Sequence, residues 1–306
     1  GETKSIFFEI FFKVLKKKKI KNPLVLIASK KILQQQMGRF NFRKKIKLLD
    51  YKNLKNIKLN NQSINLIDVV INNSRKDYKN YYIKESFDIA FKLIKSRYSK
   101  KFINGPINKK NFLKRKFLGI TEYISDNFKT KNTAMLIYNE NLSVCPITTH
   151  LPLKLVSKKI SKKLIFDKTI LINNFYKNVL GIKPKIAVTG LNPHCESILT
   201  DNEDIKIITP AIKNLKKKGF KVDGPFPADT IFLRKNRIKY NVIIGMYHDQ
   251  VLTPMKTLKE HDAFNITLGL PFFRISPDHG PNEKMVNQNK SNPTSLLKAI
   301  KFLDKK

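Results

Sequence analysis

Residues 242–250 read V-I-I-G-M-Y-H-D-Q, an apolar run that changes abruptly into polar side chains. The run from Val242 to Met246 is short and unbroken, which is typical of a strand buried on both faces of a parallel sheet. We expect the strand to end before three polar residues, His248, Asp249 and Gln250. In open α/β sheets, ligands bind beyond the carboxyl ends of the strands. The stretch therefore predicts a parallel α/β fold with a functional site at this edge.

Two further apolar runs end in the same way, and each is followed by a histidine. Residues 143–148, S-V-C-P-I-T, lead to His150, and residues 186–191, I-A-V-T-G-L, lead to His194. Neutral imidazole is the commonest metal ligand, and three histidines that leave one position open form a catalytic metal pattern. The equivalent positions of His150, His194 and His248 therefore favour a divalent metal site. The alternative is three loop histidines that make ordinary hydrogen bonds.

Strands and helices alternate along the rest of the chain. The sequence predicts strands at 24–28 and 101–103, and helices at 5–19, 84–98 and 291–303. Another helix opens near Gly119, with Thr121 as a candidate cap. Such alternation predicts an α/β fold with a largely parallel sheet.

The composition is that of a globular protein. With 306 residues, 41% of them hydrophobic, the chain can form one large or two ordinary α/β domains. No apolar run reaches the ~18 residues of a membrane span and no secretory signal is evident, so we expect no membrane partner. Cys145 and Cys195 form neither a disulfide framework nor a zinc motif, which favours the reducing cytoplasm. Gly1 is not a methionine, so we expect the chain to lack its true start.

The formal net charge of +38 suggests nucleic-acid binding, but the distribution of the charge opposes it. Lysines are scattered through every segment together with many Asn, Ile and Phe, while Trp is absent and Gly numbers only 11. Lys, Asn, Ile and Phe have A/T-rich codons, whereas Trp and Gly codons need G. We therefore interpret the charge as nucleotide bias that coats the surface with lysine, and we expect no specific nucleic-acid partner.

A second polar set lies downstream of the last strand. Lys256, Asn265 and Arg274 combine a point charge, an amide and a bidentate guanidinium, which suit a phosphate or carboxylate. In a chain with 61 Lys and Arg, a single cation is usually solvated surface. Arg274, however, lies within the apolar run 270–275, where lysine bias does not explain it.

Two further residues allow two interpretations each. Asp229 follows G-P-F-P-A at 224–228 and could either cap a helix or face the site. Cys195 adjoins His194, as a nucleophile would adjoin its base, but adjacency in sequence gives no hydrogen-bond geometry. A small buried core residue is the preferred interpretation of Cys195.

Seven motifs, in order along almost the whole chain, resemble the 4-hydroxythreonine-4-phosphate dehydrogenase family. They are G-P-I-N-K (105–109), T-T-H-L-P-L (148–153), G-L-N-P-H (190–194), G-P-F-P-A-D-T-I-F (224–232), Y-H-D-Q (247–250), N-I-T-L-G-L-P-F-F-R (265–274) and D-H-G (278–280). The family consists of NAD-dependent enzymes of pyridoxal phosphate biosynthesis. It resembles isocitrate and isopropylmalate dehydrogenases, which implies two α/β/α domains with a cleft between them.

The resemblance also implies a domain division and a homodimer. It places residues 1–110 and 262–306 in a first α/β/α domain, whose first strand is missing here. Residues 111–261 form a second domain, which carries the metal histidines and the dimer interface. The resemblance implies an active site in the cleft, at the interface between the two subunits.

The implied site residues fall into two groups. The resemblance implies that His150, His194 and His248 bind a divalent metal such as zinc, magnesium or cobalt, with ligands drawn from both subunits. The phosphorylated amino-acid substrate is bound by the group Thr121, Lys256, Asn265 and Arg274. NAD is the second implied cofactor.

The implied reaction is the oxidation of 4-phosphohydroxy-L-threonine to a β-keto acid, which decarboxylates to 3-amino-2-oxopropyl phosphate. A Lewis-acid metal suits both the oxidation and the loss of carbon dioxide. The base that takes the hydroxyl proton has three candidates, Asp249, Asp229 and Lys256.

The chain departs from the family pattern at its start and at 119–122, and it also lacks the family's glycines after Asp278-His279-Gly280 and after Glu196. The family's first strand runs into a G-E-P-x-G-I-x-x-E motif, of which Gly1, Glu2, Ile6 and Glu9 remain, and the strand itself is missing. The family's G-H-T-E is G-I-T-E at 119–122, so Ile120 replaces a substrate-binding histidine. The alternative function is therefore a catalytically weakened or silent relative that acts as a binding protein.

Overall fold

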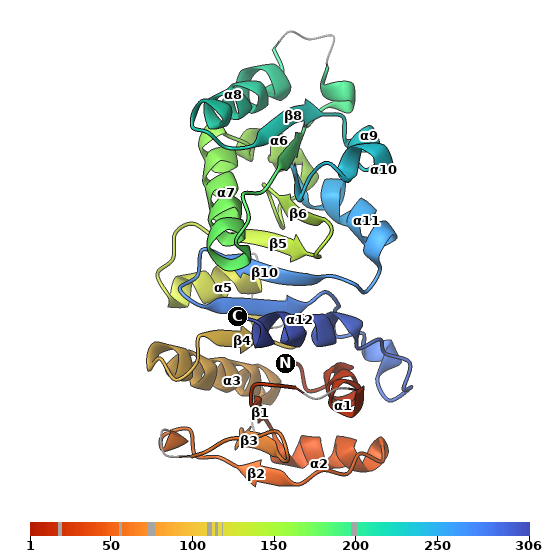
Figure 1. The fold of residues 1–306 in the computed structure, drawn as a ribbon. Helices are drawn as coiled ribbons and strands as arrows, with labels where there is room; N and C mark the ends of the chain where they lie inside the picture. The colour runs from red at the N-terminus through yellow and green to blue at the C-terminus, as the bar shows by residue number, and fades with distance from the viewer. Residues whose placement is uncertain are drawn as a thin grey trace. The chain divides into compact units, whose positions relative to one another are not determined.

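The structure, a computed structural model, describes residues 1–17, 20–54, 57–72, 77–108, 112–113, 116–117, 119–196 and 201–306. The chain divides into two compact units (Figure 1): unit 1 comprises Gly1–Arg115 and Pro271–Lys306, and unit 2 comprises Lys116–Leu270. Strands and helices alternate in both units, so the predicted α/β class is confirmed. Lys109 of the G-P-I-N-K motif lies outside the described residues.

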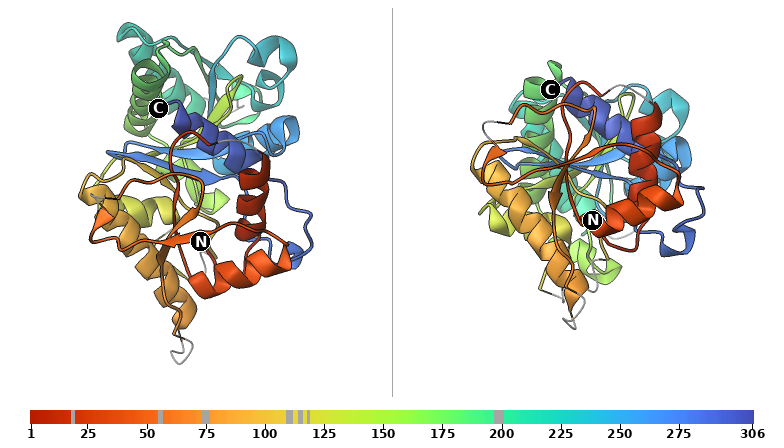
Figure 2. Two further views of the ribbon diagram at one scale, coloured as in Figure 1. Left: turned by 60° about the horizontal axis from the view of Figure 1, so that its bottom comes forward. Right: turned by 90° about the horizontal axis from the view of Figure 1, so that it is seen from below.

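Unit 1 is built from two separate chain segments. Its elements are α1 (Phe7–Lys17), β1 (Val25–Ala28), α2 (Lys30–Arg39), β2 (Ile46–Leu48), β3 (Ile64–Asp68), α3 (Tyr78–Lys95), β4 (Lys101–Ile103), β11 (Phe273–Pro277), η6 (Glu283–Met285) and α12 (Thr294–Asp304). Strands β1, β3 and β2 form a parallel sheet in that order, and β11 pairs in parallel with β4. Figure 2 shows these strands between α3 on one side and α1 and α2 on the other.

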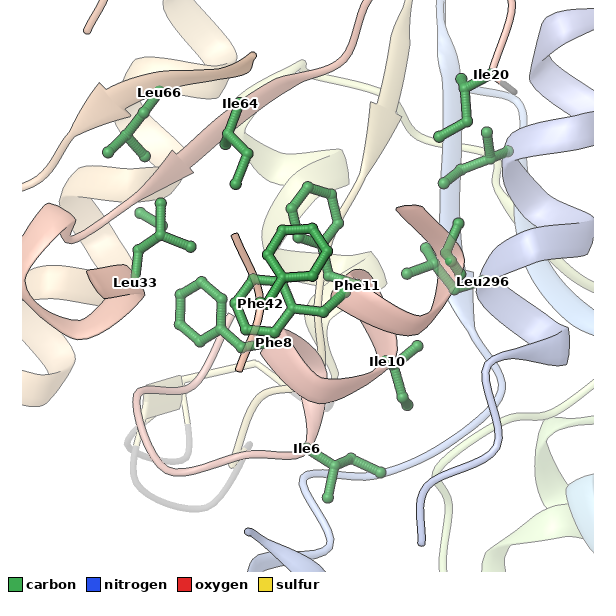
Figure 3. Packing of buried hydrophobic residues seen from close by; sticks show 14 residues of the cluster. Ile6, Phe8, Ile10, Phe11, Ile20, Leu33, Phe42, Ile64, Leu66 and Leu296 are labelled. Atoms are coloured by element: carbon green, nitrogen blue, oxygen red, sulfur yellow. The ribbon is translucent and has the colours of Figure 1, made fainter. Parts of the chain in front are cut away.

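The core of unit 1 gathers apolar side chains from α1, α2, β3 and α12 (Figure 3). Helix α1 forms because its phenylalanines and isoleucines recur at helical spacing and give it one apolar side. Phe12 of α1 is 2% exposed and stacks on Phe42, with ring centroids 4.5 Å apart. The helix predicted at 5–19 is therefore confirmed as α1, and its apolar side is buried in this core.

Glu9 joins the two chain segments of unit 1. Its side chain is 2% exposed, and Oε1 accepts hydrogen bonds from Lys13 Nζ at 2.8 Å and from Ser291 N at 2.6 Å. Lys13 Nζ also donates to the carbonyl oxygens of Asn289 and Ser291, at 2.8 and 2.9 Å. A buried carboxylate on α1 thereby fixes the segment that precedes α12.

A cavity of about 500 Å³ lies within unit 1, beside the edges of two strands. It is lined by Val25, Leu26 and Ile27 of β1 and by Phe102 and Ile103 of β4. Among the described residues of unit 1, no strand pairs with the second edge of β1 or of β4. These five lining residues are accordingly only half-buried.

Unit 2 is one continuous stretch of chain. Its elements are α5 (Ile120–Asn127), β5 (Ala134–Tyr138), β6 (Ser143–Pro146), η2 (Leu153–Leu155), α6 (Val156–Lys159), α7 (Lys162–Phe175), η3 (Tyr176–Leu180), β7 (Ile186–Thr189), η4 (Pro193–Cys195), η5 (Asp204–Ile208), α8 (Thr209–Lys217), β8 (Val222–Phe226), α9 (Ala228–Ile231), α10 (Arg234–Arg237), β9 (Val242–Gly245), α11 (His248–Lys259) and β10 (Phe264–Leu268). Its strands lie in the order β10-β5-β6-β9-β7-β8. Helices α7 and α8 cover one face of this sheet and α11 covers the other (Figure 1).

Strand direction divides the unit 2 sheet into two parts. Strands β6, β9, β7 and β8 are parallel, as predicted, whereas β5 runs antiparallel to both β6 and β10. Residues 262–270, which the family resemblance placed in the first domain, belong to unit 2 because β10 pairs with β5. No helix in the described part of the chain is long and apolar enough to cross a membrane.

Candidate active site

The carboxyl ends of β6, β9 and β7 lie side by side at one edge of the unit 2 sheet. Strand β9 pairs in parallel with both neighbours. Thr148, just past β6, donates from Oγ1 to the carbonyl oxygen of Met246 at the end of β9, at 2.7 Å. The three segments that leave this edge carry His150, His194 and His248, so each histidine follows a strand as predicted.

His150 and His248 approach each other closely. Their ring centroids are 5.9 Å apart, and their planes differ by 38°. A metal ion about 2.0–2.1 Å from one nitrogen of each ring places the two centroids roughly 5–6 Å apart. The pair thus has the spacing of two ligands of one ion.

The ring of His248 is oriented by its neighbour. His248 is the first residue of α11, and its Nδ1 lies 2.7 Å from Asp249 Oδ1. A metal-binding histidine usually donates its other ring N–H to a carboxylate or carbonyl, which fixes the tautomer. The contact with Asp249 therefore assigns Nε2 of His248 as the nitrogen suited to an ion.

His194 is placed differently from the other two histidines. It lies in the short turn η4, is exposed, and has a φ of 57°. Within the described ranges of this single chain, no group of three His, Cys, Asp or Glu side chains is arranged to hold a metal ion. The described part of one chain therefore brings His150 and His248 together, and the role of His194 as a third ligand stays a prediction.

Glu122 and His150 both approach Gly119, an arrangement that the sequence did not predict. A Cβ atom on Gly119 would lie 2.7 Å from Glu122 Oε2 and 3.0 Å from His150 Nδ1, so both atoms approach the same point. Glu122 Oε2 is buried and has no hydrogen-bond partner in the part of the chain that the structure describes. The glycine of G-I-T-E thus leaves room for a carboxylate and an imidazole, and the motif itself was the available signal.

Three of the predicted substrate-binding residues belong to unit 2. Thr121 is the second residue of α5, which is capped by Gly119, so the predicted cap at Thr121 is wrong: the turn that precedes the helix ends two residues earlier. Lys256 is exposed on α11. Asn265 is half-buried on β10, and its Oδ1 is a buried acceptor without a partner among the described residues. Asn265 therefore offers a ligand an amide oxygen.

Arg274, the fourth predicted substrate-binding residue, belongs to unit 1. It lies on β11, is 3% exposed, and donates from Nε to Asn104 Oδ1 at 2.8 Å. It is not a solvated surface cation, as its apolar surroundings predicted.

The structure excludes one interpretation of Asp229 and the preferred interpretation of Cys195. Cys195 is only half-buried and lies in the turn η4, so its interpretation as a small buried core residue is wrong. Asp229 is exposed in the first turn of α9, whose cap is Pro227, so a capping role is wrong. Burial raises the pKa of the Cys195 thiol, and the nearby carboxylates of Asp204, Asp229 and Glu196 raise it further. A raised pKa disfavours the thiolate that a nucleophile needs.

Gln250 of the Y-H-D-Q motif has a structural role that the sequence did not predict. Its Oε1 accepts from Met246 N at 2.6 Å and from Thr189 Oγ1 at 2.9 Å. Its Nε2 donates to the carbonyl oxygen of Gly190 at 2.8 Å. One side chain on α11 therefore ties together the ends of β9 and β7, which hydropathy patterns do not reveal.

A comparison with protein families identifies the chain. The family described as pyridoxal phosphate biosynthetic protein PdxA matches residues 19–303. The chain belongs to the PdxA family. This confirms the family that the motifs predicted, and with it an oxidoreductase class and an α/β fold.

Relatives of the PdxA family cover nearly the whole chain. The 4-hydroxythreonine-4-phosphate dehydrogenase of Sulfurihydrogenibium sp. (strain YO3AOP1) is 36% identical over 317 residues, which cover 99% of this chain and 95% of the relative. The crystal structure of the enzyme of that name from Klebsiella pneumoniae superimposes with a TM-score of 0.82 at 27% identity, over 99% of this chain and 96% of that one. A D-threonate 4-phosphate dehydrogenase of Salmonella typhimurium is 36% identical over 200 residues, covering 64% of this chain and 61% of the relative.

Proposed function

We propose that this chain is a metal-dependent, NAD-linked 4-hydroxythreonine-4-phosphate dehydrogenase that serves pyridoxal 5'-phosphate biosynthesis. The observation that carries the proposal is the His150–His248 pair, with ring centroids 5.9 Å apart, in a member of a dehydrogenase family. Relatives named for this activity are similar over almost the full length of the chain.

The residues that would hold the metal are His150 and His248 of one chain, with His194 from the partner subunit. The spacing of the first two and the Asp249 contact of His248 fit a divalent ion such as zinc, magnesium or cobalt. When bound, such an ion supplies Lewis-acid stabilisation of the negative charge that develops on the substrate oxygen.

The remaining residues bind the substrate and move its proton. The unpartnered amide oxygen of Asn265 suits the substrate's amine, and the cations Lys256 and Arg274 suit its phosphate and carboxylate. Asp249 holds His248 through Nδ1, which favours an orienting role for it over that of a base. Lys256 and Asp229 therefore become the stronger candidates for the proton acceptor.

The proposed reaction balances in two steps. The carbon that bears the hydroxyl transfers a hydride to NAD and the hydroxyl proton goes to the base, which gives a ketone β to the carboxylate. The bond to the carboxylate then breaks, carbon dioxide leaves, and the electron pair forms an enolate. Protonation of the enolate carbon yields 3-amino-2-oxopropyl phosphate.

The test is NADH formation from 4-phosphohydroxy-L-threonine with zinc, magnesium or cobalt present. His150→Ala and His248→Ala should abolish the metal-dependent rate and leave the far-UV circular dichroism unchanged. His261→Ala, which removes an exposed histidine of the same unit, is the matched control and should keep the rate. Full activity of His248→Ala would refute the proposed site.

D-threonate 4-phosphate is a second candidate substrate, because one of the relatives is named for it. The two compounds share a secondary alcohol, a phosphate and a carboxylate, and differ by an amine or a hydroxyl beside the carboxylate. The ratio of kcat/KM for the two substrates decides between them. No turnover of either one with any of the three metals would support the alternative function, a silent relative that acts as a binding protein.

The proposal includes a homodimer, with the active site at the subunit interface, and a location in the cytoplasm. One chain contributes two adjacent histidines, so a third ligand from the partner subunit would complete the site. The two free cysteines, Cys145 and Cys195, are consistent with a reducing compartment. Sedimentation as a monomer at micromolar concentration, with metal and substrate present, would contradict the dimer.

A further inference from the structure

The segment between β7 and His194 has a backbone conformation that its surroundings must hold in place. His194 and Cys195 have φ values of 57° and 60°, two consecutive left-handed residues that are not glycine. Such residues are disfavoured and persist only where surrounding contacts fix them. The segment therefore requires anchors, and two side chains provide them.

Asp204 anchors the segment from one side. Its side chain is 1% exposed, and Oδ1 accepts from Leu191 N at 2.8 Å. Its Oδ2 accepts from the backbone N of Asn192 at 3.0 Å and from the side-chain Nδ2 of Asn192 at 2.8 Å. A Cβ atom on Gly190 would lie 2.6 Å from Asp204 Oδ1, so the carboxylate packs where only glycine leaves room. One buried carboxylate thus holds the two residues that precede the turn of His194.

Gln250 anchors the same segment from the other side. Its Nε2 holds the carbonyl oxygen of Gly190, while its Oε1 holds Thr189 and the end of β9. Gln250 is two residues from His248 in α11, so its bonds connect the start of the His248 helix with the start of the His194 segment. Movement of either element would break bonds to the other.

We propose that Asp204 and Gln250 are positioning residues that fix the His194 segment relative to His248. The inference rests on the proposed metal site, which needs each of the three histidines to present a nitrogen in a defined direction in its own subunit. Their hydrogen bonds go to the residues on either side of the strand end, so we assign both a role that acts through the backbone that carries His194. Mutation of residues that orient metal ligands typically lowers metal affinity about 10–100-fold.

The test is a double-mutant cycle on metal binding by the full chain. The dissociation constant for Co²⁺ alone is measured by calorimetry, together with the visible spectrum of the bound ion. Asp204→Asn replaces one acceptor oxygen with an amide that faces N–H donors, and Gln250→Ala removes all three Gln250 bonds. Each should weaken Co²⁺ binding about 10–100-fold and change the spectrum. In a His194→Ala background neither should weaken binding further, because the group they position is gone.

Tyr176→Phe is the matched control. Tyr176 is 3% exposed and donates from its hydroxyl to Ser143 Oγ at 2.9 Å, so its loss lowers stability without touching the His194 segment. Co²⁺ affinity should be unchanged in this variant, and a similar loss there would overturn the inference. If Asp204→Asn fails to fold, Gln250→Ala decides alone.

The outcomes separate the inference from the proposed function. Wild-type affinity in Gln250→Ala, or an equal loss in the His194→Ala background, overturns the positioning role and leaves the proposed function standing. Failure of the wild-type chain to bind Co²⁺ overturns the metal site and the inference together.

Discussion

Glu9→Ala should lower the free energy of unfolding by about 2–4 kcal/mol. The substitution leaves the N–H of Ser291, a residue that is 3% exposed, without the acceptor at 2.6 Å, which costs about 1–3 kcal/mol. It also removes the ion pair with Lys13. Lys13 is 25% exposed and keeps two carbonyl acceptors. Removal of this ion pair by itself should therefore cost less than the ~3–5 kcal/mol that breaking a fully buried pair costs.

Urea unfolding followed by circular dichroism measures the effect. Glu9→Gln keeps an acceptor oxygen for Ser291 N and removes only the charge, so it should cost about half as much. Asp88→Ala is the matched control, because Lys84 and Asp88 form a pair with the same spacing along a helix but are 64% and 39% exposed. The control should change stability by less than about 0.5 kcal/mol. If Glu9→Ala fell within the range of this control, the joining role assigned to Glu9 would be refuted.

Three further predictions concern Ile120, Tyr82 and the cavity of unit 1. Ile120→His should raise kcat/KM for the phosphorylated substrate about ten- to a hundredfold, because the isoleucine side chain, which is 6% exposed, cannot donate a hydrogen bond to an anionic oxygen. An unchanged kcat/KM would mean that the site binds the substrate without a donor at this position. Burial raises the pKa of Tyr82 from 10.0 to about 12, so between these values the unfolded chain holds fewer protons and stability should fall as pH rises. In urea unfolding, the stability of Tyr82→Phe should fall less steeply between pH 10 and 12 than that of the unchanged chain. An identical pH dependence in the two proteins would contradict this role of Tyr82. Gly1 lines the cavity beside β1 and β4. Addition of about five β-branched residues before Gly1 should raise the melting temperature, because the added segment can pair with an open strand edge. An unchanged melting temperature would mean that the segment does not pair there.

The parallel strands of unit 2 could be predicted because their signal is local. Strands β6, β7 and β9 are unbroken apolar runs that end in polar residues, and each lies where its pattern indicated. The pairing of β10 with β5 could not be predicted, because it joins residues more than a hundred positions apart and depends on the whole sheet. Helix α3 begins at Tyr78, earlier than the predicted 84, because Lys79 and Asn80 stand in its first turn and hide the buried positions Tyr82 and Ile83 that follow.

The candidate site, like the fold, could be predicted only where its signal is local in the sequence. The sequence indicated that each histidine follows a strand, and motif order identified the family. It did not reveal that His150 and His248 are the adjacent pair within one chain, because that distance depends on how two segments leave the sheet. The sequence placed Gln250 at this edge without a role and did not single out Asp204, because both act through hydrogen bonds to backbone groups, which residue type does not indicate.

The division of unit 1 into two chain segments sets the order in which the protein can fold during synthesis. Strand β11 and helix α12 are translated after all of unit 2, and Glu9 must wait for Ser291 to complete its hydrogen bonds. At about 5–20 residues per second, the ribosome needs roughly 10–30 s to make the intervening unit. Throughout that interval α1 lacks the apolar side of α12 that covers it. The phenylalanines of α1 therefore stay accessible to chaperones, and prone to aggregation, until α12 has been made.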